Sequence, residues 1–177
     1  MSTTHLIDRV ARRYGLPLFK TPVGFKYIAD LLLRKRIIFG GEESACFAVK
    51  SHLPEKDGIF AGLLVAEMMA ATGKNLTQLR AGFFREYGKK SSGQRSIRLH
   101  PKNERKLKDL IINPPEYLGG RMVVAVERID GIKLDFEDDD WLLLRPSGTE
   151  PLIRCYAEAG TNKELERLLD LGLKRLD

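Results

Sequence analysis

The first 40 residues alternate between helical and strand-like patterns of apolar positions. Residues 6–11 and 27–34 place apolar side chains at helical spacing, whereas residues 16–19 and 37–39 are short, continuous apolar runs. Apolar runs of this length between helices are typical of strands that are buried on both faces of a parallel sheet. The pattern therefore predicts part of an α/β domain with a mainly parallel sheet.

The chain changes character after residue 87. Helical spacing predicts two further helices before that point, at 59–70 and 75–87. Residues 88–120 are rich in Gly, Ser, Pro, Lys and Arg, a composition typical of a junction between domains. We therefore expect a first domain over residues 1–87, a linker or junction over residues 88–120, and a second domain over residues 121–177.

The second domain has the pattern of a small α+β fold. Its four strand-like segments follow one another, and Asp130-Gly131 between the first two is typical of a hairpin turn. Thr161 and Glu164 form a capping box that predicts a last helix. Mostly antiparallel strands with helical cover are therefore expected. From the junction onward, the predicted strands are 96–100, 122–129, 132–136, 141–144 and 152–158, and the predicted helices are 103–112 and 161–176.

Composition limits the class of protein. The chain has 177 residues, of which 43% are hydrophobic and 31% charged, and these are enough to build a core. No apolar run approaches the roughly 18 residues of a membrane span, and the N-terminus lacks the pattern of a signal peptide. Cys46 and Cys155 lie far apart and in no metal-binding spacing, as expected of reduced thiols. We expect a cytoplasmic protein without a membrane partner.

The positive charge is concentrated in one stretch. The formal net charge is +6, and residues 85–108 hold nine Lys or Arg against Glu86 and Glu104, an excess of seven. Such a block can bind nucleic acid. Aromatic residues there are few, so a base-stacking platform is poorly supported. A solvated connecting segment and a basic surround for an anionic sugar phosphate are the other two interpretations.

A loop bracketed by prolines, residues 145–151, carries the most specific chemistry. It lies between two apolar runs of strand length, and its prolines force the chain to leave the first strand sharply. Ser147 and Thr149 offer hydroxyls, Arg145 offers a guanidinium, and Gly148 permits positive φ and close backbone approach. This combination suits a phosphate group. A turn in which Ser and Thr only cap the backbone uses the same residue types.

Two more segments accompany this loop. Residues 21–26 read Thr-Pro-Val-Gly-Phe-Lys, and residues 40–44 read Gly-Gly-Glu-Glu-Ser, with Glu-Lys-Asp-Gly at 55–58. Together with Arg-Pro-Ser-Gly-Thr-Glu-Pro at 145–151, followed by Arg154, they resemble motifs of the α-D-phosphohexomutases. This family contains phosphoglucomutases, phosphomannomutases and phosphoglucosamine mutases. The resemblance spans most of the chain and implies a three-layer α/β domain III followed by a TATA-binding-protein-like domain IV.

The resemblance implies a role for each matching residue. Lys26 would face the substrate near the transferring phosphoryl group and is the catalytic candidate. Glu42 and Ser44 would hold two sugar hydroxyls, since a carboxylate accepts hydrogen bonds and a hydroxyl both donates and accepts them. His52 and Lys56 would lie beside the cleft and are second-tier candidates. The residues implied in phosphate binding are Arg145, Ser147, Gly148, Thr149 and Arg154.

One residue departs from the family pattern. Many members have glycine where this chain has Ala45, immediately after the sugar-binding Ser44. If that position requires positive φ, alanine costs roughly 1 kcal/mol or more there.

The residues that would carry the phosphoryl transfer are not recognised in this chain. The family's phosphoserine loop and its Asp-rich magnesium loop have no counterpart, and Asp138, Asp139 and Asp140 read as a polar turn rather than a metal site. Magnesium and a phosphoserine are therefore implied for the complete enzyme only, and no metal site is expected here. We expect the chain alone, as a split gene product or a truncated reading frame, not to be a competent mutase.

Three hypotheses about function follow. The first is the C-terminal portion of a phosphohexomutase that binds a hexose phosphate or bisphosphate and depends on a separate N-terminal half. The second is a non-catalytic sugar-phosphate-binding or regulatory fragment. The third is a basic nucleic-acid-binding module, whose binding would be sensitive to salt and to removal of the charges in residues 85–108.

Overall fold

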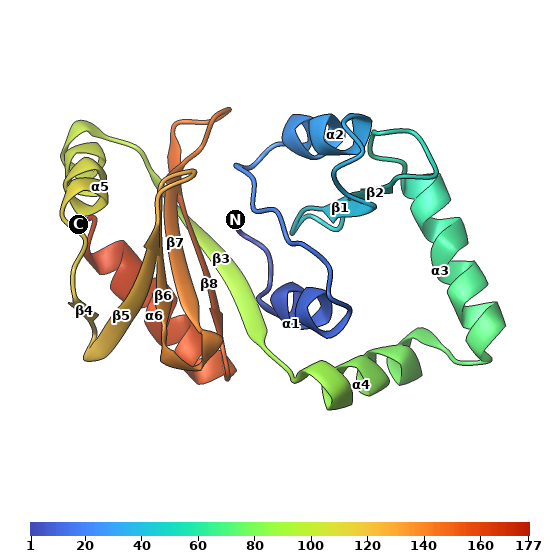
Figure 1. Ribbon diagram of the computed structural model, residues 1–177. Coiled ribbons are helices and arrows are strands. Elements are labelled where there is room, and N and C mark those ends of the chain that lie inside the picture. Colours follow the sequence, from blue (N-terminus) through green and yellow to red (C-terminus); the bar gives the residue numbers. More distant parts are fainter. The chain divides into compact units, whose positions relative to one another are not determined.

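The chain folds into two units. A computed structural model describes all 177 residues (Figure 1). One unit comprises residues 6–89, and the other comprises residues 1–5 together with residues 90–177. The structure thus divides the chain between Lys89 and Lys90. No helix in the structure has both the length and the apolar character that crossing a membrane requires.

A six-stranded antiparallel sheet forms the C-terminal unit (Figure 1). Every neighbouring pair of strands is antiparallel, and the strand order is β3-β8-β7-β6-β5-β4. The helices α5 (Pro101–Ile112) and α6 (Asn162–Lys174) pack against the sheet. The strands are β3 (Ser91–Arg98), β4 (Tyr117–Leu118), β5 (Arg121–Glu127), β6 (Ile132–Phe136), β7 (Trp141–Pro146) and β8 (Leu152–Ala159), with a 3₁₀ turn, η1 (Glu137–Asp139), between β6 and β7.

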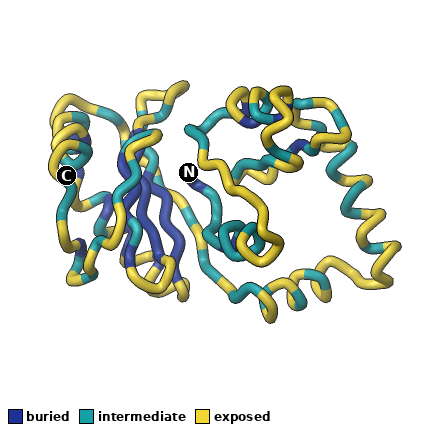
Figure 2. The backbone as a smooth tube through the Cα atoms, viewed as in Figure 1, coloured by how far each residue is buried: buried dark blue, intermediate teal, exposed yellow.

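The central strands of this sheet are buried on both faces (Figure 2). Leu142 and Leu144 of β7 pack with Leu168 of α6 in the main core. Side chains alternate across a strand, so Trp141 and Leu143 point to the opposite face, where they form a smaller cluster with Tyr156. Burial on both faces explains why these strands appear in the sequence as continuous apolar runs.

The first five residues of the chain belong to the C-terminal unit. The amide of His5 donates a hydrogen bond of 2.9 Å to Glu158 Oε1. The fully buried Lys133 lies with its Nζ 2.7 Å from His5 Nε2 and 4.8 Å from the centre of the Trp141 ring. These contacts combine buried charge with apolar packing on the face of the sheet that carries Trp141.

Much of the C-terminal unit agrees with the sequence. The Asp130-Gly131 hairpin joins β5 to β6 as predicted, and Thr161 caps α6 by accepting a hydrogen bond from the Glu164 amide. Residues 88–120 contain more regular secondary structure than expected of a junction, because β3, α5 and β4 fall within this stretch. β3 pairs along its whole length with β8, which fixes the stretch to the sheet despite its Lys, Ser and Gly content.

The N-terminal unit is mainly helical. Its small core consists of Phe25, Ile28 and Leu32, together with Ala48. The elements are α1 (Leu6–Arg13), α2 (Phe25–Leu33), β1 (Phe39–Gly41), β2 (Phe47–Val49), α3 (Gly58–Thr72) and α4 (Leu76–Tyr87).

The prediction of a mainly parallel sheet in this unit is wrong, although the chain as a whole is a mixed α/β protein. Residues 16–19 form no strand, and Leu16 is 46% exposed. β1 begins at Phe39 and pairs antiparallel with β2, so the unit contains only a two-stranded hairpin. A buried parallel strand depends on the backbone of a neighbouring strand. Residues 6–89 supply no such partner for residues 16–19.

The apolar helix α3 contributes no buried residue (Figure 2). The helix itself was predicted from helical spacing, yet Ile59 is 81% exposed and Leu63 is 64% exposed. Glu67 is the only charged residue of this helix. A helix with so little polar surface is typically buried in a complete domain.

Candidate functional site

The β1–β2 hairpin presents the sugar-binding candidates of the N-terminal unit. Gly40 lets this hairpin lie directly against α2, because a Cβ at that position would come within 2.4 Å of Ile28 Cγ2. The connection between β1 and β2 then carries Glu42 and Ser44. A larger residue at position 40 would push these two residues away from α2.

Glu42 contacts the beginning of α2. Its Oε1 accepts a hydrogen bond of 3.0 Å from the Gly24 amide, and its own amide donates to Cys46 O at 2.8 Å. Ser44 is exposed at the tip of the connection. Ala45 has a φ of 64°, which meets the condition under which alanine was expected to be costly at this position.

Two lysines lie near the same helix start. Lys26 is exposed in the first turn of α2, with its Nζ 5.0 Å from the centre of the Tyr27 ring. Lys56 Nζ is 5.7 Å from the centre of the Phe25 ring. The structure therefore brings Glu42, Lys26 and Lys56 to one end of α2.

His52 has a structural partner. Its Nε2 lies 2.9 Å from Asp57 Oδ2, and its ring stacks on Phe60 with 3.9 Å between ring centres. Asp57 is the N-cap of α3, since its Oδ1 accepts a hydrogen bond from the Phe60 amide. The hydrogen bond from the Phe60 amide, with a further contribution from His52, lowers the pKa of the Asp57 carboxyl. These contacts hold the segment that carries Lys56.

The proline-bracketed loop connects β7 to β8 in the C-terminal unit. The amide of Ser147 donates to Leu152 O at 2.8 Å, and the amide of Leu152 donates to Glu150 O at 2.8 Å. The Thr149 amide lies 3.5 Å from Ser147 Oγ, which is a long contact. Gly148 does not use the positive φ that glycine permits, and a Cβ there would meet open space.

Two arginines flank this loop on neighbouring strands. Arg145 of β7 lies directly opposite Arg154 of β8 in the ladder, so both side chains are on the same face of the sheet. Arg145 is 8% exposed, and its Nε donates to Asp130 Oδ2 at 2.9 Å. Arg154 pairs with Glu150 of the loop. The pKa of Arg154 is raised above its usual value, mainly by the charge of Tyr156 and further by hydrogen bonds to Tyr156 and Glu150.

Sequence reasoning missed two carboxylates of this region, Asp130 and Glu150. Asp130 was recognised only as part of a hairpin turn, and Glu150 only as a residue of the loop. The pairing of Ile132 with Leu144 brings the turn beside Arg145. The pairing of the predicted strands 132–136 and 141–144 was the signal that could have identified Asp130. Asp130 lies two residues before Ile132, so this pairing places it near Arg145, the residue after Leu144.

The basic stretch of residues 85–108 offers less free charge than its composition suggests. Lys90 pairs with Asp140, Arg95 pairs with Glu166 and Asp170 of α6, and Lys108 pairs with Glu104. These residues lie on α5, on β3 and at the start of the C-terminal unit rather than on one element. The pairing reduces the positive charge that this stretch can offer to a nucleic acid.

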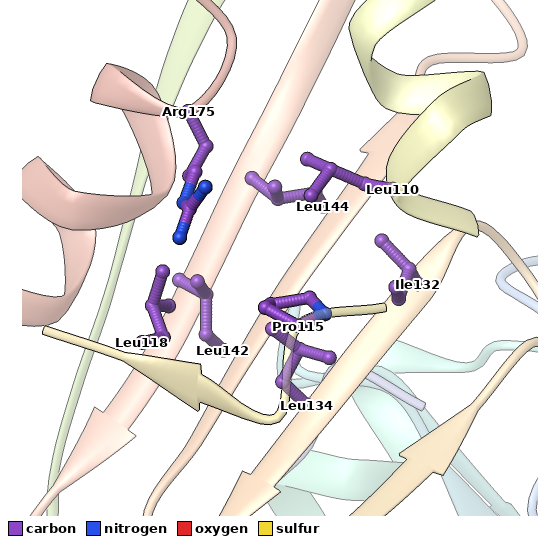
Figure 3. Close-up of a pocket in the computed structure, with 8 residues that line it drawn as sticks. All are labelled: Leu110, Pro115, Leu118, Ile132, Leu134, Leu142, Leu144 and Arg175. Carbon is purple, nitrogen blue, oxygen red and sulfur yellow. The ribbon is translucent and has the colours of Figure 1, made fainter. Parts of the chain in front are cut away.

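A small pocket lies apart from the candidate residues (Figure 3). It has a volume of about 10 Å³, and Arg175 is the only charged residue beside it. The other residues that line it are Leu110, Pro115, Leu118, Ile132, Leu134, Leu142 and Leu144. An apolar space of this size holds at most one water, so we read it as a packing defect beneath α5 rather than a ligand site.

The Asp138–Asp140 run forms a turn, as predicted. Asp138 and Asp139 have positive φ, whereas Asp140 is buried and pairs with Lys90 and Arg121. No group of three or more His, Cys, Asp or Glu side chains in the structure could hold a metal ion.

The fold defines a class of mixed α/β proteins whose candidate residues lie in loops between strands. Comparison with known proteins identifies the family. Residues 1–87 match the family model for phosphoglucomutase/phosphomannomutase, alpha/beta/alpha domain III, and residues 101–171 match the model for the phosphoglucomutase/phosphomannomutase C-terminal domain. The chain belongs to the phosphoglucomutase/phosphomannomutase family.

Curated relatives are similar over nearly the whole chain. A phosphoglucomutase/phosphomannomutase of Thermococcus kodakarensis is 30% identical over 177 residues, which are 100% of this chain and 37% of that protein. A phosphoglucosamine mutase of Methanocaldococcus jannaschii is 30% identical over 169 residues, which are 96% of this chain and 36% of that protein. The chain therefore spans about a third of the length of these relatives.

A solved structure supports the fold. The open form of parafusin, a phosphoglucomutase from Paramecium, matches with a TM-score of 0.78 at 24% identity, over 100% of this chain and 36% of that chain.

Proposed function

We propose that this chain supplies phosphate and sugar binding to a phosphohexomutase, which moves a phosphoryl group between the 1- and 6-positions of a hexose phosphate. The observation that carries the proposal is the pair of arginines, Arg145 and Arg154, that face each other beside a loop rich in hydroxyl groups. Sequence relatives that are named as mutases of hexose phosphates support it.

The phosphate that is not reacting binds at the β7–β8 loop. Two guanidinium groups directly opposite each other on adjacent strands repel, and each has only one carboxylate partner in the structure, Asp130 or Glu150. A phosphate between the arginines accepts hydrogen bonds from both. Ser147, Gly148 and Thr149 line the same loop and offer hydroxyl and amide donors.

The sugar binds at the hairpin of the N-terminal unit. Oε1 of Glu42 is used by the Gly24 amide, which fixes the carboxylate and leaves Oε2 to accept from a sugar hydroxyl. Ser44 is exposed and can both donate and accept. Lys26, in the first turn of α2, is the candidate for stabilising charge on the transferring phosphoryl group. Its position near Glu42 and Lys56 favours this role.

We infer that catalysis requires further polypeptide. The exposed apolar surface of α3 and of residues 16–19 needs cover, and the chain spans about a third of its relatives. A phosphoserine and magnesium, which the family resemblance implies for the complete enzyme, would be supplied with that polypeptide. The residues of this chain bind and orient the substrate, which reduces the entropic barrier of the transfer.

Calorimetric titration of the purified chain with glucose 1,6-bisphosphate tests the binding role. Arg145→Ala should weaken binding at least tenfold, because a hydrogen bond to a charged group contributes about 1.5–3 kcal/mol. Arg105→Ala is the matched control, since it removes one exposed positive charge of the same unit that belongs to α5 and not to the loop. Equal affinity of the two variants would contradict the assignment of the phosphate to this loop.

An activity assay tests the need for further polypeptide. The pure chain should not interconvert glucose 1-phosphate and glucose 6-phosphate, and detectable turnover would refute this part of the proposal. Activity that appears on adding a separate N-terminal half would favour a split mutase over a stand-alone binding fragment.

A further inference from the structure

The Asp130 carboxylate holds the Arg145 guanidinium from the neighbouring hairpin. Oδ2 of Asp130 is 2.9 Å from Arg145 Nε, and the two side chains are 21% and 10% exposed. Because the pair is largely shielded from water, it is stronger than an ion pair on an open surface. Arg145 therefore has a defined side-chain direction in the structure.

The hairpin can reach Arg145 only because its second residue is glycine. Gly131 has a φ of 90°, and a Cβ there would lie 2.2 Å from Leu144 O and 2.8 Å from Arg145 Cα. The turn thus sits directly on the backbone of β7, at the residue that carries the guanidinium. The ion pair and the close backbone approach are two separate observations that fix Asp130 beside Arg145.

The geometry of a guanidinium allows this contact at Nε without using the Nη groups. Arginine has five N–H donors in a planar fork, and Asp130 takes the one on Nε. The terminal Nη groups, which form the edge that binds phosphate in the bidentate manner, remain available. We propose that Asp130 is a positioning residue that turns this edge of Arg145 toward the phosphate at the β7–β8 loop. This inference rests on the proposed phosphate binding.

Charge repulsion and positioning predict opposite effects on phosphate affinity when Asp130 is removed. A carboxylate near a phosphate repels it, so removal of Asp130 should tighten phosphate binding if the residue has no positioning role. If Asp130 orients Arg145, Asp130→Ala should weaken binding about tenfold despite the loss of the repelling charge. Asp130→Asn keeps an acceptor for Nε–H and removes the charge, so it should bind at least as tightly as the unaltered chain.

The experiment titrates the full chain and its variants with glucose 1,6-bisphosphate and follows the Arg145 side-chain Nε–H resonance by NMR. We expect the resonance to be slow to exchange in the unaltered chain and in Asp130→Asn, and fast to exchange in Asp130→Ala. Asp138→Asn is the matched control, since it removes an exposed carboxylate outside the Asp130–Arg145 ion pair and asparagine tolerates the positive φ of this position. Trp141 fluorescence verifies that each variant is folded.

The outcomes separate the two proposals. Binding by the unaltered chain together with equal or tighter binding by Asp130→Ala overturns the positioning role and leaves the phosphate site intact. Absence of binding by the unaltered chain overturns the phosphate site, and the positioning role with it. Weaker binding by Asp130→Ala, rescue by Asp130→Asn and the change in the Nε–H resonance support the positioning role.

Discussion

Loss of the charge on Asp140 should destabilise the C-terminal unit strongly, because this carboxylate is buried. Its Oδ1 lies 2.9 Å from Lys90 Nζ and its Oδ2 lies 2.8 Å from Arg121 Nη2. The side chains of Asp140 and Lys90 are 4% and 7% exposed, whereas Arg121 is a quarter exposed. Loss of the carboxylate would therefore leave Lys90 buried without a counter-charge.

The expected loss in the free energy of unfolding follows from this burial. Breaking a buried ion pair by removing one partner costs about 3–5 kcal/mol. We expect about 3 kcal/mol for Asp140→Asn, because the amide still accepts a hydrogen bond and the Arg121 contribution is screened by water. In a domain of this size, 1 kcal/mol shifts the Tm by roughly 4–8 °C. The expected decrease in Tm is therefore roughly 12–24 °C.

The assay is thermal unfolding followed by tryptophan fluorescence. Trp141 is the only tryptophan of the chain and is buried in the C-terminal unit, so its signal reports that unit alone. Asp138→Asn is the matched control from the same turn. It is exposed, asparagine tolerates its positive φ, and its effect should stay within about 0.5 kcal/mol.

A second substitution tests the cause. If the cost arises from the unpaired ammonium, Lys90→Met in the Asp140→Asn background should recover much of the lost stability, because it removes the unpaired buried charge. A decrease in Tm for Asp140→Asn no larger than for Asp138→Asn, or no recovery with Lys90→Met, would refute the reasoning.

Four further predictions use other parts of the chain. Burial raises the pKa of Cys155 to about 12, so a thiol reagent at pH 8 should label only Cys46 in the native chain and both thiols in denaturant, as counted by mass spectrometry. Since the folded state keeps this proton, stability should also fall as the pH rises above about 9. Ala45→Gly should stabilise the hairpin by about 0.5 kcal/mol, because relief of the left-handed conformation exceeds the added chain entropy; unchanged hydrogen exchange of the Glu42 amide would argue against this. Thr161→Ala should cost about 1 kcal/mol in urea unfolding, since the helix loses its N-cap acceptor, and a cost near zero would mean that the cap is dispensable.

The C-terminal unit could be predicted because its signals are local. β5, β6, β7 and β8 follow one another and pair with their sequence neighbours, so alternation and a hairpin turn largely define the arrangement. β3 escaped full recognition because its partner, β8, lies more than 50 residues away. Ser, Gly, Gln and Arg along its length hid a strand that is polar on its exposed face.

The N-terminal unit could not be predicted in the same way. Residues 16–19 have the composition of a buried strand, but a strand forms only where another strand accepts its hydrogen bonds. Such a partner is a property of the surrounding structure and not of the segment. The helix α3 illustrates the same limit, since its apolar sequence predicts burial and the structure leaves it exposed.

Recognition of the candidate site depends on both the sequence motifs and the structure. The motifs identified Arg145 and Glu42, and the structure added the partners that hold them, Asp130 for Arg145 and the Gly24 amide for Glu42. Each partner occupies one side of the functional group, Nε of Arg145 and Oε1 of Glu42, and the proposed ligands use the other side. Arg145 is supported by a sheet with an extensive core, whereas Glu42 lies in a unit with a small core and exposed apolar helices. Rigid support makes binding geometry precise, so of the two proposed binding roles, phosphate recognition should need the least help from other polypeptide.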